Sequence, residues 1–350
     1  MPAKMVKKMG EFDVIERYFK RPERHLARAA CVALGIGNDC ALVQPCPGTQ
    51  IAVSSDMLVQ GRHFFDSVDP QALGHKALAV NLSDLAACGA KPLAFTLALA
   101  LPAVNEAWLQ GFSSGLFALA DRHGCELVGG DTTRGPLNIC ITVLGEIPLH
   151  NGQSTALLRS GAKPGDDVYV SGNLGDARLA LEVMRGNQQL GDTQFQLARE
   201  RLERPTPRVA LGQALRGIAS AAVDVSDGLL GDLRHVLKAS GVGATLRTDL
   251  ALALLAAQSA LRAALAHPVA PTDTQLTERL WLGYVLAGGD DYELAFTAPK
   301  ASHAAVAAAA ASARAPVSVI GQIDTELGLR LVDARGAEVE NHFKSFDHFA

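Results

Sequence analysis

Segments typical of strands and segments typical of helices alternate along both halves of this 350-residue chain. From Leu93 to Leu101, bulky side chains alternate with Ala or Thr, and a period of two predicts a core strand. Asn105 then precedes an apolar spacing of three and four residues that stops at Gly124, which predicts a capped helix. Repeated strand–helix alternation predicts an α/β fold.

The same patterns place the other elements. We expect strands at 51–53, 93–101, 126–128, 139–144, 168–171, 222–225 and 292–297. We expect helices at 11–20, 69–89, 105–124, 176–185, 195–203, 229–240 and 304–313. The first helix should bury Phe12, Ile15 and Phe19, while 267–277 should form a loop.

The regular pattern stops near 145–160, where glycine and proline accumulate as far as Pro164-Gly165. At about 150 residues per domain, a chain of this length favours two domains. We therefore expect one domain at 1–150 and a second at 151–350.

Composition and charge narrow the class of protein. Apolar residues make up 48% and charged residues 19%, as in ordinary globular proteins, and the net charge of −4 predicts no nucleic-acid partner. The apolar run 92–104 is shorter than the roughly 20 residues that a membrane-spanning helix needs, so we expect no membrane segment. The basic N-terminal stretch lacks a following apolar segment, and the six cysteines form no C-x-x-C pair, so we expect a cytoplasmic protein with reduced thiols.

Five acidic segments share one setting, in which an apolar run leads through small or hydroxylated residues to aspartate. They are 35–39, 53–56, 129–133, 223–228 and 288–291. Any one of them, taken alone, is more often a turn or a helix cap, but five together favour carboxylates projected from the ends of buried elements.

Oxygen ligands without a His or Cys cluster favour Mg²⁺ over zinc. Glycines beside the carboxylates let backbone N–H groups approach a phosphate, and metal ions would have to separate the phosphate from the carboxylates. The Walker A, Rossmann and protein-kinase motifs are absent, as is the G-x-S-x-G of a serine nucleophile. The sequence therefore indicates a Mg-nucleotide site that works by positioning and electrostatics, which suits phosphoryl transfer.

An ordered set of motifs resembles the bacterial thiamine-monophosphate kinase family, within the superfamily of aminoimidazole ribonucleotide synthetase. The motifs are GEFDVIERYF, LGIGNDCAL, SSDMLVQGRHF, KALAVNLSDLAACGAKP, GGDTTRGP, RSGAKPGD, VDVSDGLLGDL, GGDDYEL and FDHFA. The resemblance implies transfer of the γ-phosphoryl group of ATP to thiamine monophosphate with several Mg²⁺ ions. It also implies a homodimer of two-domain α/β chains whose N-terminal strands form a barrel across the dimer.

The resemblance also implies roles for individual residues. Metal-binding positions are Asp39, Ser54, Ser55, Asp56, Asp84, Asp131, Asp224 and Asp227, of which Asp56, Asp131 and Asp227 are expected to be catalytic. Positions that contact ATP are Gly130, Asp131, Arg159 and Ser226, and positions that contact substrate are His63, Asp290 and Phe346. Asp84 rests on the resemblance alone.

Two positions depart from the family pattern. Asn38 replaces one of two usual acids, and Asp290 replaces a usual Glu, which shortens that carboxylate by one methylene. These departures leave two alternatives open. The chain could be another ATP-dependent enzyme of the superfamily, acting on an aminoimidazole precursor or on selenide, or a Mg-nucleotide-binding protein that has lost its chemistry.

Overall fold

The computed structural model describes residues 9–21, 31–255 and 271–346, which form two compact units. Unit 1 contains the described residues up to Asn81 together with Pro92–Glu146, and unit 2 contains Leu82–Lys91 and the described residues from Ile147 onward. Among the described residues, no helix combines the length and the apolarity required to cross a bilayer.

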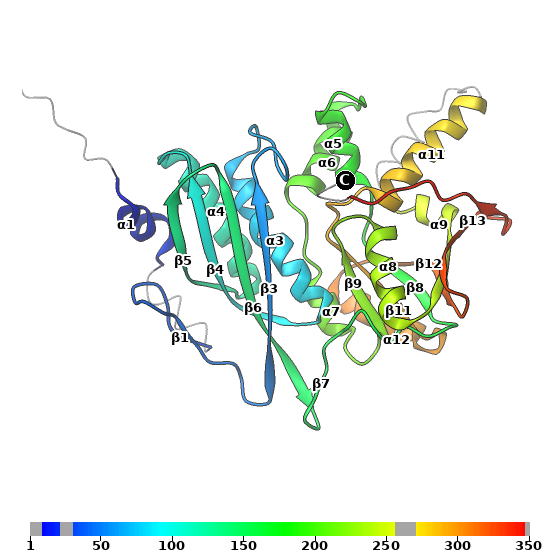
Figure 1. Cartoon of the computed structure of the whole chain (residues 1–350), viewed down its shortest axis with the longest axis horizontal. Coiled ribbons are helices and arrows are strands. Elements are labelled where there is room, and N and C mark those ends of the chain that lie inside the picture. The colour runs from blue at the N-terminus through cyan, green and yellow to red at the C-terminus, as the bar shows by residue number, and fades with distance from the viewer. Residues whose placement is uncertain (1–8, 22–30, 256–270, 347–350) are drawn as a thin grey trace, which may run out of the picture. The chain divides into compact units, whose positions relative to one another are not determined.

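Unit 1 is built on a mixed sheet with strand order β3-β6-β4-β5, which can be followed in Figure 1. Its strands are β3 (Thr49–Val59), β6 (Asn138–His150), β4 (Lys91–Leu101) and β5 (Glu126–Arg134), and the short β7 (Gln153–Ser154) pairs with the end of β6. β1 (Val32–Leu34) and β2 (Leu42–Val43) form a separate antiparallel pair. The helices are α1 (Glu11–Val14), followed by a π-helical turn at Ile15–Phe19, α3 (Pro70–Ala87) and α4 (Glu106–His123).

Unit 2 is built on a seven-stranded sheet with order β14-β13-β10-β12-β8-β11-β9. Its strands are β8 (Asp167–Ser171), β9 (Ala221–Val225), β10 (Gly243–Arg247), β11 (Glu293–Ala298), β12 (Val317–Asp324), β13 (Gly328–Val332) and β14 (Glu338–Val339). Its helices are α5 (Asp176–Met184), α6 (Asp192–Glu203), α7 (Val209–Ala214), α8 (Leu229–Ser240), α9 (Thr248–Leu252), α11 (Pro271–Ala287) and α12 (His303–Ala313), with a 3₁₀ turn at Lys300–Ser302. Side chains of α8, α11 and the sheet share one apolar core.

Helix boundaries that depend on capping are confirmed. The Asp69 carboxylate accepts the backbone N–H of Ala72 at 2.9 Å, and Asn105 accepts that of Trp108 at 3.1 Å. Gly124 and Gly241 end α4 and α8 in the left-handed conformation that glycine adopts most easily. Local side-chain chemistry therefore determines where these helices begin and end.

Several element predictions are wrong. The segment 11–20 is a short α-helix and a π turn, and because the π turn shifts the buried face, Val14, Tyr18 and Phe19 are buried while Phe12 is 81% exposed. In the predicted loop 267–277, the part from Pro271 onward is helix α11, and 267–270 lie outside the described residues. Proline at the start of α11 fits the first turn of a helix, where its missing N–H costs nothing.

Two glycines in unit 1 allow α3 and α4 to pack with their backbones in close contact. A Cβ atom on Gly74 would lie 2.0 Å from the Phe112 carbonyl oxygen, and one on Gly115 would lie 1.9 Å from the Gln71 carbonyl oxygen. Both distances are far below van der Waals contact, so any larger side chain would force the helices apart.

Gly115→Ala is therefore expected to lower the free energy of unfolding by about 1–3 kcal/mol, the usual cost of overpacking. The matched control is Ser114→Ala, at an exposed position on the same helix, which should change it by less than about 0.5 kcal/mol. Urea titration of both variants makes the comparison. Equal stabilities would contradict the close approach of α3 and α4.

His123, in the last turn of α4, has its pKa lowered from 6.5 to about 4 by burial and by the nearby Arg122 and His75. The unfolded chain takes up this proton near pH 6.5, whereas the folded chain resists it until about pH 4. The contribution of His123 to the free energy of unfolding is therefore fully present above pH 6.5, and it is lost as the pH falls from 6.5 toward 4.

Between pH 7 and pH 5, this residue should remove about 2 kcal/mol from the free energy of unfolding. His123→Gln should lose correspondingly less over the same interval, as measured by urea titration at both pH values. His150→Gln, at an exposed position, serves as the control and should retain the pH dependence of the parent chain. An unchanged slope in His123→Gln would refute the assignment.

Candidate functional site

Strand β3 carries Ser54, Ser55 and Asp56, and its pleat separates them. The Ser55 hydroxyl lies on the side of β6, within hydrogen-bond distance of the Ile141 carbonyl at 3.2 Å and the Thr142 hydroxyl at 3.0 Å. Successive strand residues point to opposite faces, so Ser54 and Asp56 share the other face. The Ser55 hydroxyl therefore lies on the opposite face of β3 from the Asp56 carboxylate, and metal binding by Ser54, Ser55 and Asp56 stays a prediction.

Asp56 is positioned by helix α3. Its backbone N–H donates to the Oδ1 atom of Asn81 at 3.1 Å, and the Nδ2 atom of the same buried Asn81 donates to the Ala77 carbonyl at 3.0 Å. This amide therefore joins the strand that carries Asp56 to a helical turn. Sequence reasoning did not identify Asn81 as a positioning residue.

Gly130 and Asp131 lie inside β5, which continues in parallel pairing with β4 as far as Arg134. At Gly130, φ is +141° and a Cβ atom would lie 1.8 Å from the Leu97 carbonyl oxygen, so this position requires glycine. The expectation that the carboxylates follow the ends of strands is wrong for Asp56 and Asp131. Both carboxylates project from the middle of long strands, whose rigidity fixes their positions.

Asp39 and His63 lie in the connections of unit 1. Asp39 is exposed in the segment between β1 and β2. His63 follows β3 in a turn, where its Nδ1 atom accepts the Val59 backbone N–H at 3.0 Å. Acceptance at Nδ1 means that the neutral ring carries its proton on Nε2.

In unit 2, further candidate residues lie near one another, and they come from the end of α3, the segment that follows β7, and β9. The buried Ser83 hydroxyl donates to Asp224 Oδ2 at 2.9 Å. Local desolvation and the negative charges of Asp84 and Asp224 raise the pKa of the Cys88 thiol, while the positive charge of Arg159 lowers it. These charges act on one thiol, so Asp84, Asp224 and Arg159 share a neighbourhood.

A second group in unit 2 surrounds the turn between β9 and α8. The Asp232 carboxylate is 5% exposed and accepts the backbone N–H groups of Ser226 at 3.0 Å and Asp227 at 3.1 Å. Burial, with the charge of Asp227, raises the pKa of Asp232 to about 7. The buried Asp232 carboxylate thus stabilises the turn that carries Ser226 and Asp227. The sequence did not single out Asp232.

Two of the three predicted substrate residues contact the same turn. The Asp290 N–H donates to the Ser226 carbonyl at 2.8 Å, and the Phe346 N–H donates to the Asp227 carbonyl at 3.0 Å. Asp290 has φ +61°, and its carboxylate accepts the Tyr292 hydroxyl at 3.4 Å. The structure therefore brings Ser226, Asp227, Asp290 and Phe346 together from three distant parts of the chain.

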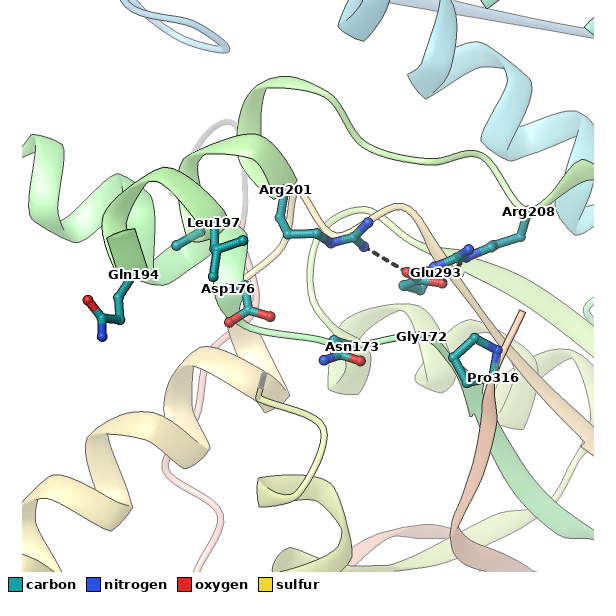
Figure 2. A pocket seen from close by; sticks show the side chains of 10 residues that line it. Gly172, Asn173, Asp176, Gln194, Leu197, Arg201, Arg208, Glu293 and Pro316 are labelled. Carbon is teal, nitrogen blue, oxygen red and sulfur yellow. Dashed lines mark hydrogen bonds and ion pairs between the residues drawn. The ribbon is translucent and has the colours of Figure 1, made fainter. Parts of the chain in front are cut away.

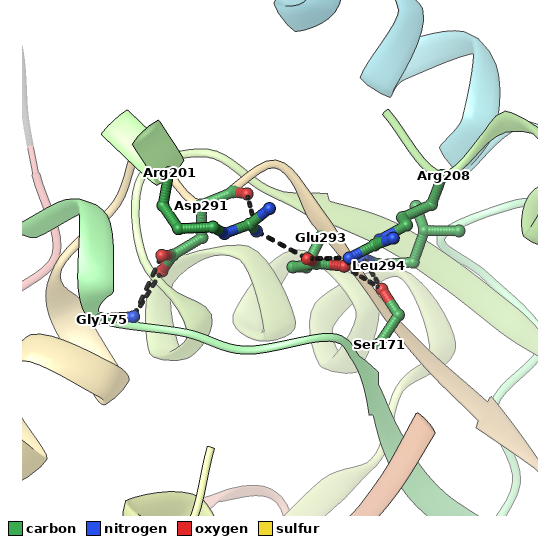
Figure 3. Close-up of polar contacts among 7 residues, drawn as sticks. All are labelled: Ser171, Gly175, Arg201, Arg208, Asp291, Glu293 and Leu294. Carbon is green, nitrogen blue, oxygen red and sulfur yellow. Dashed lines mark hydrogen bonds and ion pairs between the residues drawn. The ribbon is translucent and has the colours of Figure 1, made fainter. Parts of the chain in front are cut away.

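Figure 3 shows a buried polar network around Asp291 and Glu293, which follow Asp290 in the sequence. Asp291 is 1% exposed, and its carboxylate accepts the Gly175 N–H at 3.0 Å, at the start of α5. The fully buried Glu293 accepts hydrogen bonds from Arg201 at 2.7 Å, Arg208 Nη2 at 2.6 Å and the Ser171 hydroxyl at 2.6 Å. Burial raises the pKa of Asp291 well above its usual range.

Two arginines and one carboxylate leave this triad with one net positive charge, next to a cavity of about 280 Å³ (Figure 2). Arg201, Arg208, Asn173 and Gln194 are among the residues that line the cavity, and none of the predicted site residues does. The network fixes the start of β11 and with it the position of Asp290. In the sequence, the only sign of this role is that further acids follow Asp290 immediately.

The candidate residues form one set in each unit. Unit 1 holds Asp39, Ser54, Ser55, Asp56, His63, Gly130 and Asp131. Unit 2 holds Asp84, Arg159, Asp224, Ser226, Asp227, Asp290 and Phe346. Both sets are rich in carboxylates and hydroxyls, which are ligands for hard cations.

Family models identify the class of protein that this fold and these residues define. Residues 37–147 match the N-terminal domain of AIR synthase related proteins, and residues 163–333 match their C-terminal domain. The chain is therefore a two-domain α/β protein of the AIR synthase related type.

More similar relatives narrow the family. Thiamine-monophosphate kinase of Salmonella typhimurium is 44% identical over 97% of this chain and 98% of its own length. The crystal structure of thiamine-monophosphate kinase from Stenotrophomonas maltophilia is 41% identical, with a TM-score of 0.77 over 91% of this chain and 96% of that chain. A solved complex of AaThiL with AMPPCP and TMP is 28% identical, with a TM-score of 0.71 over 97% of each chain. The chain belongs to the thiamine-monophosphate kinase family.

Proposed function

We propose that this chain transfers the γ-phosphoryl group of ATP to thiamine monophosphate, giving thiamine diphosphate and ADP. The observation that carries the proposal is 44% identity to a thiamine-monophosphate kinase over nearly the full length of both chains. The related complex with AMPPCP, an ATP analogue, and TMP supports the same pair of substrates. The enzyme acts in thiamine diphosphate biosynthesis.

The donor chemistry of the site fits Mg²⁺. The proposed ligands offer only oxygen atoms, and no Cys or His belongs to the set, which is Asp39, Ser54, Ser55, Asp56, Asp84, Asp131, Asp224 and Asp227. Bound Mg²⁺ would neutralise the phosphate oxygens and let the two polyanionic substrates approach each other. In this proposal, the domain at 1–150 binds Mg-ATP and forms the dimer, and the domain at 151–350 completes the active site.

The chain's own residues orient the two substrates. Gly130, Arg159 and Ser226 contact ATP, and the planar guanidinium of Arg159 can bond two phosphate oxygens at once. His63, Asp290 and Phe346 contact thiamine monophosphate, and the ring of Phe346, which is 41% exposed, can stack on the thiamine rings. The attacking phosphate oxygen is already ionised near neutral pH, so direct in-line transfer needs no general base.

A homodimer with a barrel formed across the interface is also proposed. β3 lies at one edge of the unit 1 sheet, and Ile51, Val53, Met57 and Val59 on this strand are exposed. A long, apolar edge strand is normally covered, because its unpaired backbone groups can pair with another chain. Analytical ultracentrifugation tests the dimer, and a monomer at micromolar concentration would contradict it.

The expected cytoplasmic location stays a prediction.

The decisive assay incubates the purified chain with ATP, Mg²⁺ and thiamine monophosphate and separates the products by chromatography. We expect thiamine diphosphate and ADP in equal amounts. No product here, together with turnover of an aminoimidazole precursor, would favour another enzyme of the superfamily. ATP binding measured by calorimetry without ADP release would favour a non-catalytic binding protein.

A further inference from the structure

Three side chains outside the proposed kinase site converge in unit 1. Cys31 immediately precedes β1, Cys46 follows β2, and Glu146 lies in β6. The two sulfur atoms and one carboxylate oxygen all lie within 4.8 Å of one another. These three residues are far apart along the chain, so the sequence, which has no C-x-x-C pair, did not indicate the cluster.

The surrounding structure holds the three side chains in place. The Cys46 backbone N–H donates to the Glu146 carboxylate at 3.0 Å, and the Cys46 thiol makes hydrogen bonds with Glu146 and Cys31. Cys46 lies between Pro45 and Pro47, whose rings restrict the backbone, and its carbonyl accepts the Thr49 hydroxyl at 2.6 Å. Glu146 is only 5% exposed, so its carboxylate occupies a fixed position.

Cys31 is held by contacts outside the three-residue cluster. It packs against an apolar cluster that includes Val32, Leu93 and Val128, and its carbonyl accepts the Gln44 N–H at 2.7 Å. Glu146 thus comes from strand β6, Cys46 from a proline-bounded loop and Cys31 from the residue before β1. Contacts outside the cluster help to hold each of them in place. Such pre-organisation is what distinguishes a binding site from a chance cluster of side chains.

We propose that Cys31, Cys46 and Glu146 bind one Zn²⁺ ion, with water as the fourth ligand on the exposed side of Cys46. Tetrahedral zinc with Zn–S of about 2.3 Å and Zn–O of about 2.0 Å places its ligand atoms about 3.5–3.8 Å apart, which the observed cluster can reach by a small contraction. Each thiol releases its proton to solvent on binding, so two thiolates and one carboxylate face the cation.

Zinc at this site would act on the proposed kinase site through the backbone. Cys31 and Cys46 flank the two ends of the β1–β2 hairpin, whose connecting segment carries Asp39, a proposed Mg²⁺ ligand. Bound zinc would tie both ends of this hairpin to β6. This consequence rests on the proposed function, whereas the zinc site itself does not.

The test uses Co²⁺ as a spectroscopic substitute for zinc. The full chain, purified under reducing conditions and freed of metal, is titrated with Co²⁺ in excess Mg²⁺, and sulfur-to-cobalt charge-transfer absorption is recorded. Carboxylate sites cannot produce this band, so the kinase site does not contribute. We expect one Co²⁺ per chain, displaced by one equivalent of Zn²⁺.

Cys46→Ser, at an exposed position, should fold normally and bind Co²⁺ at least about 100-fold more weakly, beyond the loss typical of an outer-shell partner. Glu146→Gln should keep the charge-transfer band with weaker binding. Cys40→Ser, which changes another exposed thiol, is the control and should bind as the parent chain does.

Three outcomes would overturn the zinc site. They are an absent band, a band that persists in Cys46→Ser, and a band lost in Cys40→Ser. Rapid disulfide formation between Cys31 and Cys46 under air in the presence of Zn²⁺, detected by peptide mass spectrometry, would also overturn it, since bound zinc protects thiolates. None of these readouts depends on kinase activity, so failure of the zinc site and failure of the proposed function are distinguishable.

Discussion

Asp131→Asn is expected to reduce the turnover of thiamine monophosphate by on the order of 100-fold or more, while the free energy of unfolding changes little. The substitution keeps the size of the side chain and removes its negative charge. Because Asp131 is exposed on β5, the fold loses no buried contact. Asp56→Asn should behave in the same way. The measurements are kcat at saturating Mg²⁺ and urea titration of each variant.

The control for this prediction is Asp121→Asn, which removes an exposed carboxylate that pairs with Arg21 in the same unit. It should leave kcat within about twofold of the parent chain, because Asp121 is not one of the proposed site residues. Near-normal turnover of Asp131→Asn at saturating Mg²⁺ would show that this residue does not bind the catalytic metal.

Glu293→Gln is expected to lower the free energy of unfolding by about 3–5 kcal/mol, the usual cost of removing one partner from a buried ion pair. The fully buried Glu293 carboxylate neutralises one of two arginines, and without its charge both guanidinium groups remain partly buried and uncompensated. The start of β11 should then shift and displace Asp290, a proposed substrate contact. The KM for thiamine monophosphate should therefore rise. Urea titration and steady-state kinetics measure the two effects.

Glu200→Gln provides the matched control on α6. Glu200 lies 3.8 Å from Arg204 and its side chain is 66% exposed, so its loss should cost less than about 1 kcal/mol. Equal stabilities of the two variants would mean that the Arg201–Arg208–Glu293 network does not hold unit 2 together.

Local sequence signals predicted the capped helix ends well. The caps at Asp69 and Asn105, and the left-handed glycines at 124 and 241, depend only on residues within one or two turns, so their chemistry is readable along the chain. The strand 93–101 was also readable, because its bulky residues alternate along a buried element.

Other features depend on distant neighbours. β5 continues through Gly129, Gly130 and Asp131 because β4 pairs with it, although glycine and aspartate normally argue against a strand. The buried face of 11–19 followed a π turn that no apolar spacing indicated. Tertiary pairing overrode local propensity in the first case, and an extra residue in a helical turn changed the periodicity in the second.

By itself, the sequence determined the α/β class and, through its ordered motifs, the family, and it predicted an oxygen-rich phosphate site. Residue type decides ligand chemistry, so the carboxylates could be recognised without coordinates. Only the tertiary structure separated the Ser55 hydroxyl from Asp56 and brought Asp232 under the turn at Asp227. It also buried Glu293 between two arginines and gathered Cys31, Cys46 and Glu146. These relations join residues that are distant in sequence, and they depend on strand pleat and packing, which a linear pattern does not encode.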